Sequence, residues 1–197
     1  MEFHTLLKNL NIKSFFSDLI IERGIEKESL RIDRNGFISK ADHPKSLGSS
    51  YTNSSITTDF AESLIEIVTP TYTNIDELYE KLKAIHVFIN QNLNDGEMLW
   101  PFSMPPKIED KSKINIATYG KTNMGRLKHV YRKGLAIRYG KTMQCVSGIH
   151  YNFSISDKSL KHLGYSSQND KNKAYLNLIR NFRISNLIKR TKCQMHL

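Results

Sequence analysis

Cysteines are scarce in this 197-residue chain and long hydrophobic runs are missing, which excludes several classes of protein. The two cysteines, Cys145 and Cys193, lie far apart, which argues against a disulfide-stabilised scaffold and fits a reducing compartment. No stretch approaches the roughly 18 consecutive apolar residues of a membrane span. The first residues include an early acid and no long apolar segment, so we expect no secretory signal. We therefore expect a cytoplasmic protein without a membrane segment.

Common catalytic and ligand-binding motifs are also missing. The chain contains neither G-x-x-x-x-G-K-[ST] nor G-x-G-x-x-G, so we expect no phosphate loop and no dinucleotide fingerprint. It has no C-x-x-C pair for zinc. Cys145 and His150 could suggest a thiol nucleophile, but strand alternation would place them on opposite faces. A thiol mechanism is therefore not favoured.

The basic residues are concentrated at the C-terminal end. The chain carries 29 Lys and Arg against 19 Asp and Glu, and residues 171–197 hold seven of the basic and none of the acidic residues. Such a tail can bind nucleic acid through counterion release. A solvated or atypical end is the favoured alternative, because the sequence shows no base-stacking motif and no helix-turn-helix.

Hydrophobic periodicity predicts a mixture of strands and helices. We expect strands over 20–32, 64–68 and 143–155, with a turn at 33–36 and a short return at 37–39; we expect helices over 2–19, 75–93, 123–139 and 172–190. Thr73 or Asn74 could cap the second helix, and Gly140 is a typical stop for the third. Residues 40–58 and 95–122 read as irregular. These elements predict an α+β fold, with helices on one face of a mainly antiparallel sheet.

Two acids on the first strand are the first candidates for chemistry. Glu26 and Glu28 are two residues apart, so their side chains share one face of a strand. Neighbouring carboxylates raise each other's pKa, and a hard cation such as Mg²⁺ relieves the repulsion. The alternative is a solvated edge strand, on which alternating acids are common.

A second acidic group follows at Asp59, Glu62 and Glu66. Glu66 lies within an apolar, β-favouring run, so its carboxylate is expected to be partly buried and to need a partner. A surface-facing Glu66 on a one-sided sheet is the alternative.

The predicted third strand carries a histidine on a polar face. Alternation places Gln144, Val146, Gly148, His150 and Asn152 together, while Cys145, Ile149, Tyr151 and Phe153 form an apolar face that could pack on helices. A lone histidine is usually only hydrogen-bonded, but its polar neighbours favour a metal-ligand role. On the helix before it, Tyr131 precedes Arg132, whose guanidinium suits a phosphate or carboxylate. The alternative for Arg132 is a surface position on a basic helix.

Six segments, in order, resemble the proteobacterial-type glutamate–cysteine ligases, between about residues 18 and 182. They are RGIEKESLR (23–31), TTDFAE through EIVTP (57–70), WPFSMP (100–105), YGKTNMGR (119–126), Tyr131-Arg132, and SGIHYNFS (147–154). Each motif alone is modest, but six in sequence are specific.

The resemblance implies a glutamine synthetase-like fold, in which an antiparallel sheet curls into a funnel with helices on its outer face. It implies Mg²⁺ sites (Mn²⁺ as an alternative) at Glu26, Glu28, Glu66 and His150. It also implies a cysteine pocket at Asp59, Phe60, Tyr131 and Gln144, and a phosphate-facing, catalytic Arg132. The implied reaction is ATP-dependent: the γ-carboxylate of glutamate attacks ATP to give γ-glutamyl phosphate, and the cysteine amine displaces phosphate. This is the first step of glutathione biosynthesis.

The resemblance fades after residue 182, where the family continues with apolar and aromatic residues. We therefore expect residues 1–182 to form the N-terminal part of a catalytic domain and residues 183–197 to be an atypical basic tail, from truncation or a frame change. A truncated chain could be inactive alone, or could need a complementary C-terminal chain. Another carboxylate–amine ligase activity and a nucleic-acid-binding module are the remaining alternatives.

Overall fold

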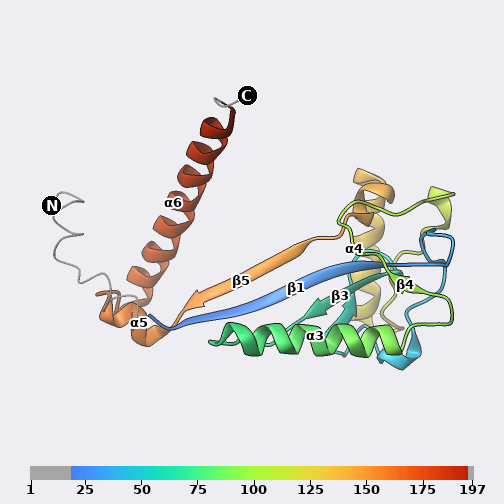
Figure 1. Cartoon of the computed structure of the whole chain (residues 1–197), viewed down its shortest axis with the longest axis horizontal. Coiled ribbons are helices and arrows are strands. Elements are labelled where there is room, and N and C mark those ends of the chain that lie inside the picture. Colours follow the sequence, from blue (N-terminus) through green and yellow to red (C-terminus); the bar gives the residue numbers. More distant parts are fainter. Residues whose placement is uncertain (1–18, 195–197) are drawn as a thin grey trace. The chain divides into compact units, whose positions relative to one another are not determined.

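The computed structural model describes residues 19–194, with side chains to residue 184 (Figure 1). The predicted helix over 2–19 therefore falls almost wholly outside the described residues. The described residues divide into two compact units, Arg23–Phe153 and the combination of residues 19–22 with residues 154–194. The strands are β1 (Ile21–Ile32), β2 (Ile56–Thr58), β3 (Leu64–Val68), β4 (Met98–Leu99) and β5 (Ile149–Ile155); the α-helices are α3 (Ile75–Gln91), α4 (Asn123–Tyr139), α5 (Asp157–His162) and α6 (Gln168–Gln194).

An open sheet is the framework of the larger unit. Its order is β2-β3-β1-β4, and β5 also pairs with β1. The pairs β1–β3, β2–β3 and β1–β4 are antiparallel, which confirms the predicted antiparallel pairing of the first two predicted strands. Figure 1 shows β3, β1 and β5 side by side. Sheet and helices together confirm the α+β fold class.

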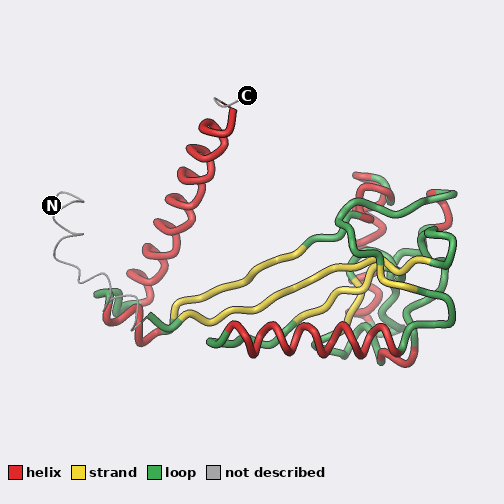
Figure 2. Tube along the Cα trace, in the orientation of Figure 1, coloured by secondary structure: helices red, strands yellow, loops and turns green. Residues whose placement is uncertain are grey.

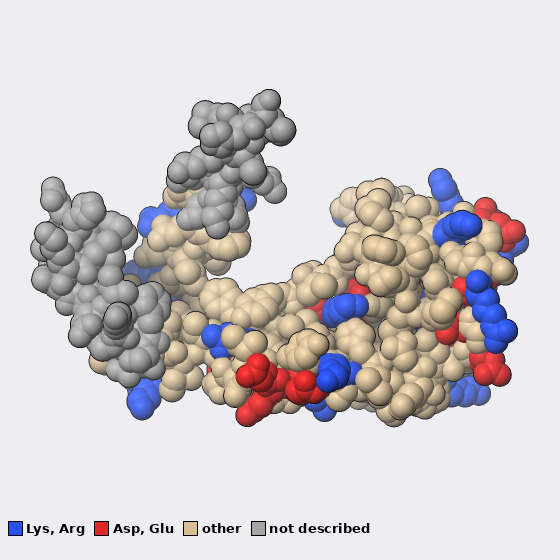
Figure 3. Space-filling view, in the orientation of Figure 1, with Lys and Arg blue, Asp and Glu red and all other residues tan. Residues whose placement is uncertain are grey.

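Helix α3 covers one face of this sheet. It begins after Asn74, whose side chain accepts hydrogen bonds from the amides of Asp76 and Glu77, and this confirms Asn74 as one of the two predicted caps. Figure 2 shows the helix running along the strands, and Figure 3 shows acidic side chains gathered over its beginning. The buried contact between helix and sheet is formed by Leu47, Ile56, Ile65, Ile67, Ile85 and Ile89.

The opposite face of the sheet is covered only toward the C-terminal end of β1. There a second core packs against Leu135 and Ala136 of α4; it consists of Leu30, Ile38, Phe60, Ala61, Leu64, Ile114 and Cys145. The 17-residue helix α4 ends at Gly140, which has a φ of 82°, as predicted. The even-numbered residues of β1 that precede Leu30 are therefore not covered by this core.

A buried arginine ties the C-terminal end of β1 to three loops. The Arg31 side chain is fully buried, and its Nη1 lies 2.6 Å from Oε1 of Glu97. Its Nη2 donates to the backbone carbonyls of Ala41, Asp42 and Glu62. Because an unpaired buried charge is costly, these contacts hold the three loops against β1.

Three predicted features of the sheet are wrong. Residues 143–148 are not strand: Thr142–Cys145 form a short 3-10 helix, and β5 begins only at Ile149. Strand β2 lies in the stretch predicted to be irregular. The expected packing of the apolar side of β5 is also wrong, because Ile149, Tyr151 and Phe153 are all exposed.

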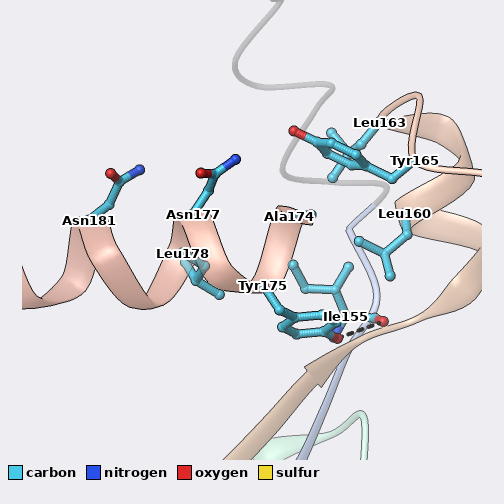
Figure 4. Close-up of a pocket in the computed structure, with 9 residues that line it drawn as sticks. All are labelled: Ile155, Leu160, Leu163, Tyr165, Ala174, Tyr175, Asn177, Leu178 and Asn181. Atoms are coloured by element: carbon cyan, nitrogen blue, oxygen red, sulfur yellow. Dashed lines mark hydrogen bonds between the residues drawn. The ribbon is translucent and has the colours of Figure 1, made fainter. Parts of the chain in front are cut away.

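The smaller unit contains α5, which was not predicted, and α6, which extends beyond the predicted helix at both ends. An apolar pocket of about 230 Å³ lies between these helices and the end of β5. In Figure 4, Tyr175 projects from α6 to Ile155, and its hydroxyl accepts a hydrogen bond from the Ile155 amide at 3.0 Å. The predicted boundary at residue 182 falls inside α6 and stays a prediction. No helix within residues 19–194 is long and apolar enough to cross a membrane.

Candidate functional site

Carboxylates gather on the uncovered face of the sheet. Strand alternation puts Glu26 and Glu28 on one side of β1, as the sequence predicted. The antiparallel register places Glu28 directly opposite Glu66 of β3, and Thr57 of β2 lies beyond Glu66 in the same row. We call Glu26, Glu28 and Glu66 the acidic surface. Like charges directly opposite each other across strands repel, so this surface is destabilising unless a counter-charge is present.

The pKa values of Glu28 and Glu66 are both raised. Partial burial raises the pKa of both Glu28 and Glu66 above the ordinary glutamate value, and the neighbouring Asp59 raises each further. For Glu28, a hydrogen bond that its Oε2 accepts from the Gly148 amide at 2.7 Å acts in the opposite direction. For Glu66, the Arg132 guanidinium lowers the pKa by a smaller amount.

Strand β5 adds an imidazole and an amide to the acidic surface. The His150 Nδ1 lies 3.3 Å from Oε2 of Glu26, and the Asn152 Nδ2 donates to Oε1 of the same carboxylate at 3.0 Å. Glu26 contacts Asn152, and Glu28 contacts Gly148, so the residue numbers increase along β1 while they decrease along β5. The two segments are therefore antiparallel. The predicted shared face of Gly148, His150 and Asn152 is therefore confirmed.

Gly148 leaves a small space at this surface. A Cβ at this position would lie 3.5 Å from Oε2 of Glu28 and 3.6 Å from Nε2 of His150. Both distances are ordinary van der Waals contacts, so a methyl group would fit without displacing the backbone. The space is thus bordered by one carboxylate oxygen and one imidazole nitrogen.

Arg132 is held beside the acidic surface by a tyrosine. Its Nε donates to the Asp59 carbonyl oxygen, its Nη2 lies 3.8 Å from Oδ1 of Asp59, and its Nη1 donates to the Lys128 carbonyl oxygen. The guanidinium carbon stands 4.7 Å from the centre of the buried Tyr119 ring. The Tyr119 hydroxyl donates to the Thr58 carbonyl oxygen at 2.7 Å. Tyr119 thereby positions both Arg132 and the backbone that precedes Asp59.

The other predicted pocket residues lie on three different segments of the chain. The Phe60 ring is 1% exposed and belongs to the core, so it presents no ring surface in this chain. Tyr131 lies on α4 and is exposed, while Gln144 lies in the 3-10 helix rather than on the strand that was predicted. Their roles toward a substrate stay predictions.

A divalent cation is compatible with the chemistry of the donors. Carboxylate oxygens are the ligands that Mg²⁺ prefers, and Mn²⁺ also accepts imidazole. Burial and the neighbouring carboxylates raise the pKa of Glu28 and Glu66, and a bound cation would favour their charged forms. Among the side chains described between residues 19 and 184, however, no three His, Cys, Asp or Glu are already arranged as a metal-binding group. Side-chain rotation would have to bring the ligands together.

Two residues of the site were not given a role by sequence reasoning. Tyr119 belongs to a quoted motif, but its contacts with Arg132 and Thr58 depend on packing between distant segments. Asn152 was placed on the correct face, and its partner Glu26 lies 126 residues away in sequence. The alternation of β5 was the available signal for Asn152; for Tyr119 the sequence carries none.

Cys145 has a structural position. Its thiol is free and fully buried, and burial raises its pKa to about 11. A thiol with so high a pKa is a poor nucleophile near neutral pH. Its place in the core next to Leu30 and Leu64 accounts for its presence.

The open antiparallel sheet of this α+β fold carries acids and an imidazole, and an arginine lies beside them. These features are typical of the class of proteins that bind cations and phosphate groups. The glutamate-cysteine ligase family model matches residues 6–189, and the chain belongs to this family. It is 48% identical over 169 residues to the glutamate–cysteine ligase of Hahella chejuensis, covering 83% of this chain and 32% of the relative. The corresponding enzyme of Bordetella bronchiseptica is 45% identical over 171 residues. The chain thus spans about a third of the length of these curated relatives.

Two solved structures are also similar to this chain over part of their own length. A crystal structure of glutamate–cysteine ligase from Francisella tularensis in complex with AMP matches with a TM-score of 0.72 and 40% identity, covering 74% of this chain and 29% of that one. A bifunctional glutathione synthetase from Pasteurella multocida matches with a TM-score of 0.71 and 32% identity, covering 84% and 21%.

Proposed function

We propose that the chain contributes the cation- and phosphate-facing part of an ATP-dependent ligase that joins the γ-carboxylate of glutamate to the amine of cysteine, the first step of glutathione biosynthesis. The observation that carries the proposal is the placement of Glu26, Glu28, Glu66 and His150 on the sheet face opposite α3, with Arg132 beside them. Family membership names the reaction, and the AMP bound to the Francisella relative supports a nucleotide substrate.

The acidic surface and His150 would hold Mg²⁺, or Mn²⁺ in its place. Such an ion, when bound, neutralises phosphate oxygens and the charge that develops during phosphoryl transfer. The protein itself needs no nucleophile, because the γ-carboxylate of glutamate attacks the γ-phosphorus of ATP and ADP leaves. The cysteine amine then attacks the γ-glutamyl carbon, and phosphate leaves as the amide forms.

Arg132 would face the nucleotide phosphates. Its guanidinium lies over the Tyr119 ring and its side chain is only 14% exposed, so little side-chain freedom remains to be lost when an anion binds. We assign Asp59, Phe60, Tyr131 and Gln144 to the cysteine side of the site. Because the Phe60 ring lies in the core, Phe60 would act by supporting Asp59 rather than by touching substrate.

A complementary polypeptide is the partner that this proposal includes. The relatives continue for about twice the length that this chain matches, and that portion would supply the rest of the site. Strand β5 pairs only with β1 among the described strands, and its apolar residues Ile149, Tyr151 and Phe153 are exposed. A strand with one free edge and an apolar face is suited to pairing with a further strand. We also propose a cytoplasmic location, which the free Cys145 thiol supports.

The test is ADP release with glutamate, cysteine, ATP and Mg²⁺. We expect turnover when the chain is mixed with the remaining portion of the Hahella relative, and little with either alone. Glu66→Gln in the same mixture should abolish turnover, whereas Lys83→Ala, on the exposed side of α3, should not. A mixture that forms a complex but releases no ADP would contradict the proposal. Turnover with another amine in preference to cysteine would favour a different carboxylate–amine ligase.

A further inference from the structure

The two oxygens of the Glu26 carboxylate are held by two different side chains of β5. Asn152 Nδ2 donates to Oε1 at 3.0 Å, and His150 Nδ1 stands 3.3 Å from Oε2. The Glu26 carboxylate is therefore oriented from both ends by residues two apart on one strand. Neither contact is made by a residue of β3, so the orientation of Glu26 depends on the pairing of β5 with β1.

The amide of Asn152 must present its nitrogen to Glu26. The opposite orientation would bring the amide oxygen against a carboxylate oxygen, and two acceptors repel. Asn152 is also a neutral donor, so unlike a lysine it adds no positive charge beside Glu26. The contact therefore fixes Oε1 and leaves Oε2 on the side of His150.

We propose that Asn152 is a positioning residue for Glu26. By holding Oε1, Asn152 directs Oε2 toward His150, so that one oxygen of Glu26 and the imidazole can bind the same divalent cation. The inference rests on the proposed function, because it assumes that Glu26 and His150 are ligands. Partners that orient metal-binding carboxylates commonly change metal affinity by about 10- to 100-fold when they are removed.

The chain contains a matched control for this contact. Ser154 is the next residue on the same side of β5, and its Oγ donates to Oε2 of Glu22 at 3.5 Å. This is again a neutral β5 side chain on a β1 carboxylate, but Glu22 is not part of the acidic surface. Removing it tests the loss of such a contact without touching Glu26.

The experiment is a titration of the 197-residue chain with Mn²⁺, followed by electron paramagnetic resonance of the free ion. Asn152→Leu keeps the size of the side chain and removes its donor, and we expect Mn²⁺ affinity to fall at least about 10-fold. Asn152→Gln retains a donor and should recover part of that affinity. Ser154→Ala should bind Mn²⁺ as the unaltered chain does. The midpoint of thermal unfolding without metal should be the same for Asn152→Leu and Ser154→Ala.

Equal Mn²⁺ affinity in Asn152→Leu and the unaltered chain would overturn the inference while leaving the metal site in place. Weaker binding accompanied by a lower unfolding midpoint in Asn152→Leu, with no recovery in Asn152→Gln, would also overturn it, since the role would then be general stability. If the unaltered chain does not bind Mn²⁺, the metal site itself fails and the inference falls with it.

Discussion

Glu28 and Glu66 face each other directly across β1 and β3, in a register that places two carboxylates side by side on the sheet face opposite α3. Their repulsion is part of the free energy of the metal-free chain. A cation that binds here would offset this repulsion, and it would therefore also stabilise the fold. This coupling makes several properties of the surface measurable without an activity assay.

Removing one charge of the pair should stabilise the metal-free chain. We expect Glu66→Gln to raise the free energy of unfolding by roughly 0.5 kcal/mol near neutral pH, because an amide opposite Glu28 does not repel it. The same variant should lose most of the stabilisation that Mg²⁺ gives the unaltered chain. Thermal unfolding with EDTA and with Mg²⁺ measures both effects. The exposed acid Glu80 on α3 provides a control, since Glu80→Gln should leave the response to Mg²⁺ unchanged.

The stability of the metal-free chain should depend on pH with a defined sign. Burial raises the pKa of Glu28 and Glu66, so the folded chain binds more protons than the unfolded chain between the ordinary glutamate pKa and the raised values. Stability from these groups therefore falls as pH rises through that window and stays low above it.

We expect the double variant Glu28→Gln with Glu66→Gln to remove this part of the pH dependence. The measurement is the difference in unfolding midpoint between the unaltered chain and the double variant from acidic to neutral pH. A difference that does not change with pH would contradict the raised pKa values. Mg²⁺ should reduce the difference above the window, where both carboxylates of the unaltered chain are charged.

Filling the space at Gly148 should weaken cation binding without unfolding the chain. The methyl group of Gly148→Ala would stand 3.5 Å from Oε2 of Glu28 and 3.6 Å from Nε2 of His150. We expect the fold to tolerate these contacts and Mn²⁺ affinity to fall at least about 10-fold, comparable to the loss of a supporting residue. Unaltered Mn²⁺ affinity would show that the space beside Gly148 is not part of the cation site.

Two glycines of α4 should respond in opposite ways to alanine. A Cβ on Gly125 would overlap the Tyr119 carbonyl group, whereas nothing lies within 4 Å of one on Gly134. We expect Gly125→Ala to destabilise the chain by about 1–3 kcal/mol and to shift Tyr119 and Arg132. Gly134→Ala should stabilise it by about 0.5–1 kcal/mol, through helix propensity. Urea unfolding compares the two, and equal effects would mean that α4 does not pack on Tyr119 as described.

Local sequence patterns were sufficient to predict those helices and strands that are specified by their own residues. The apolar spacing of Ile75–Gln91, its Asn74 cap, and the run of Leu64–Val68 each specify one element on their own. Strand β2 has three residues in a polar segment, so only its pairing with β3 defines it. Residues 142–145 alternate like a strand but form a 3-10 helix, and the burial of Cys145 in the core accompanies that conformation.

The site was predictable in part for the same reason. Alternation placed Glu26 with Glu28 and His150 with Asn152, since each pair lies on one strand. It could not supply the register that sets Glu28 opposite Glu66, nor the pairing that brings Asn152 to Glu26. The Tyr119–Arg132 stack joins a loop to a helix, and no periodicity encodes such a contact.

Arg31 prevents a slippage that would destroy this surface. If β1 moved by one residue against β3, Glu26 and Glu28 would turn toward α3, and lysine and serine side chains would take their places. Such a shift would pull the guanidinium away from Glu97 and from three backbone carbonyls that fit it only where it stands. The buried Arg31 side chain, five residues from Glu26, therefore fixes the register of β1 against β3. The distances among the carboxylates depend on that register.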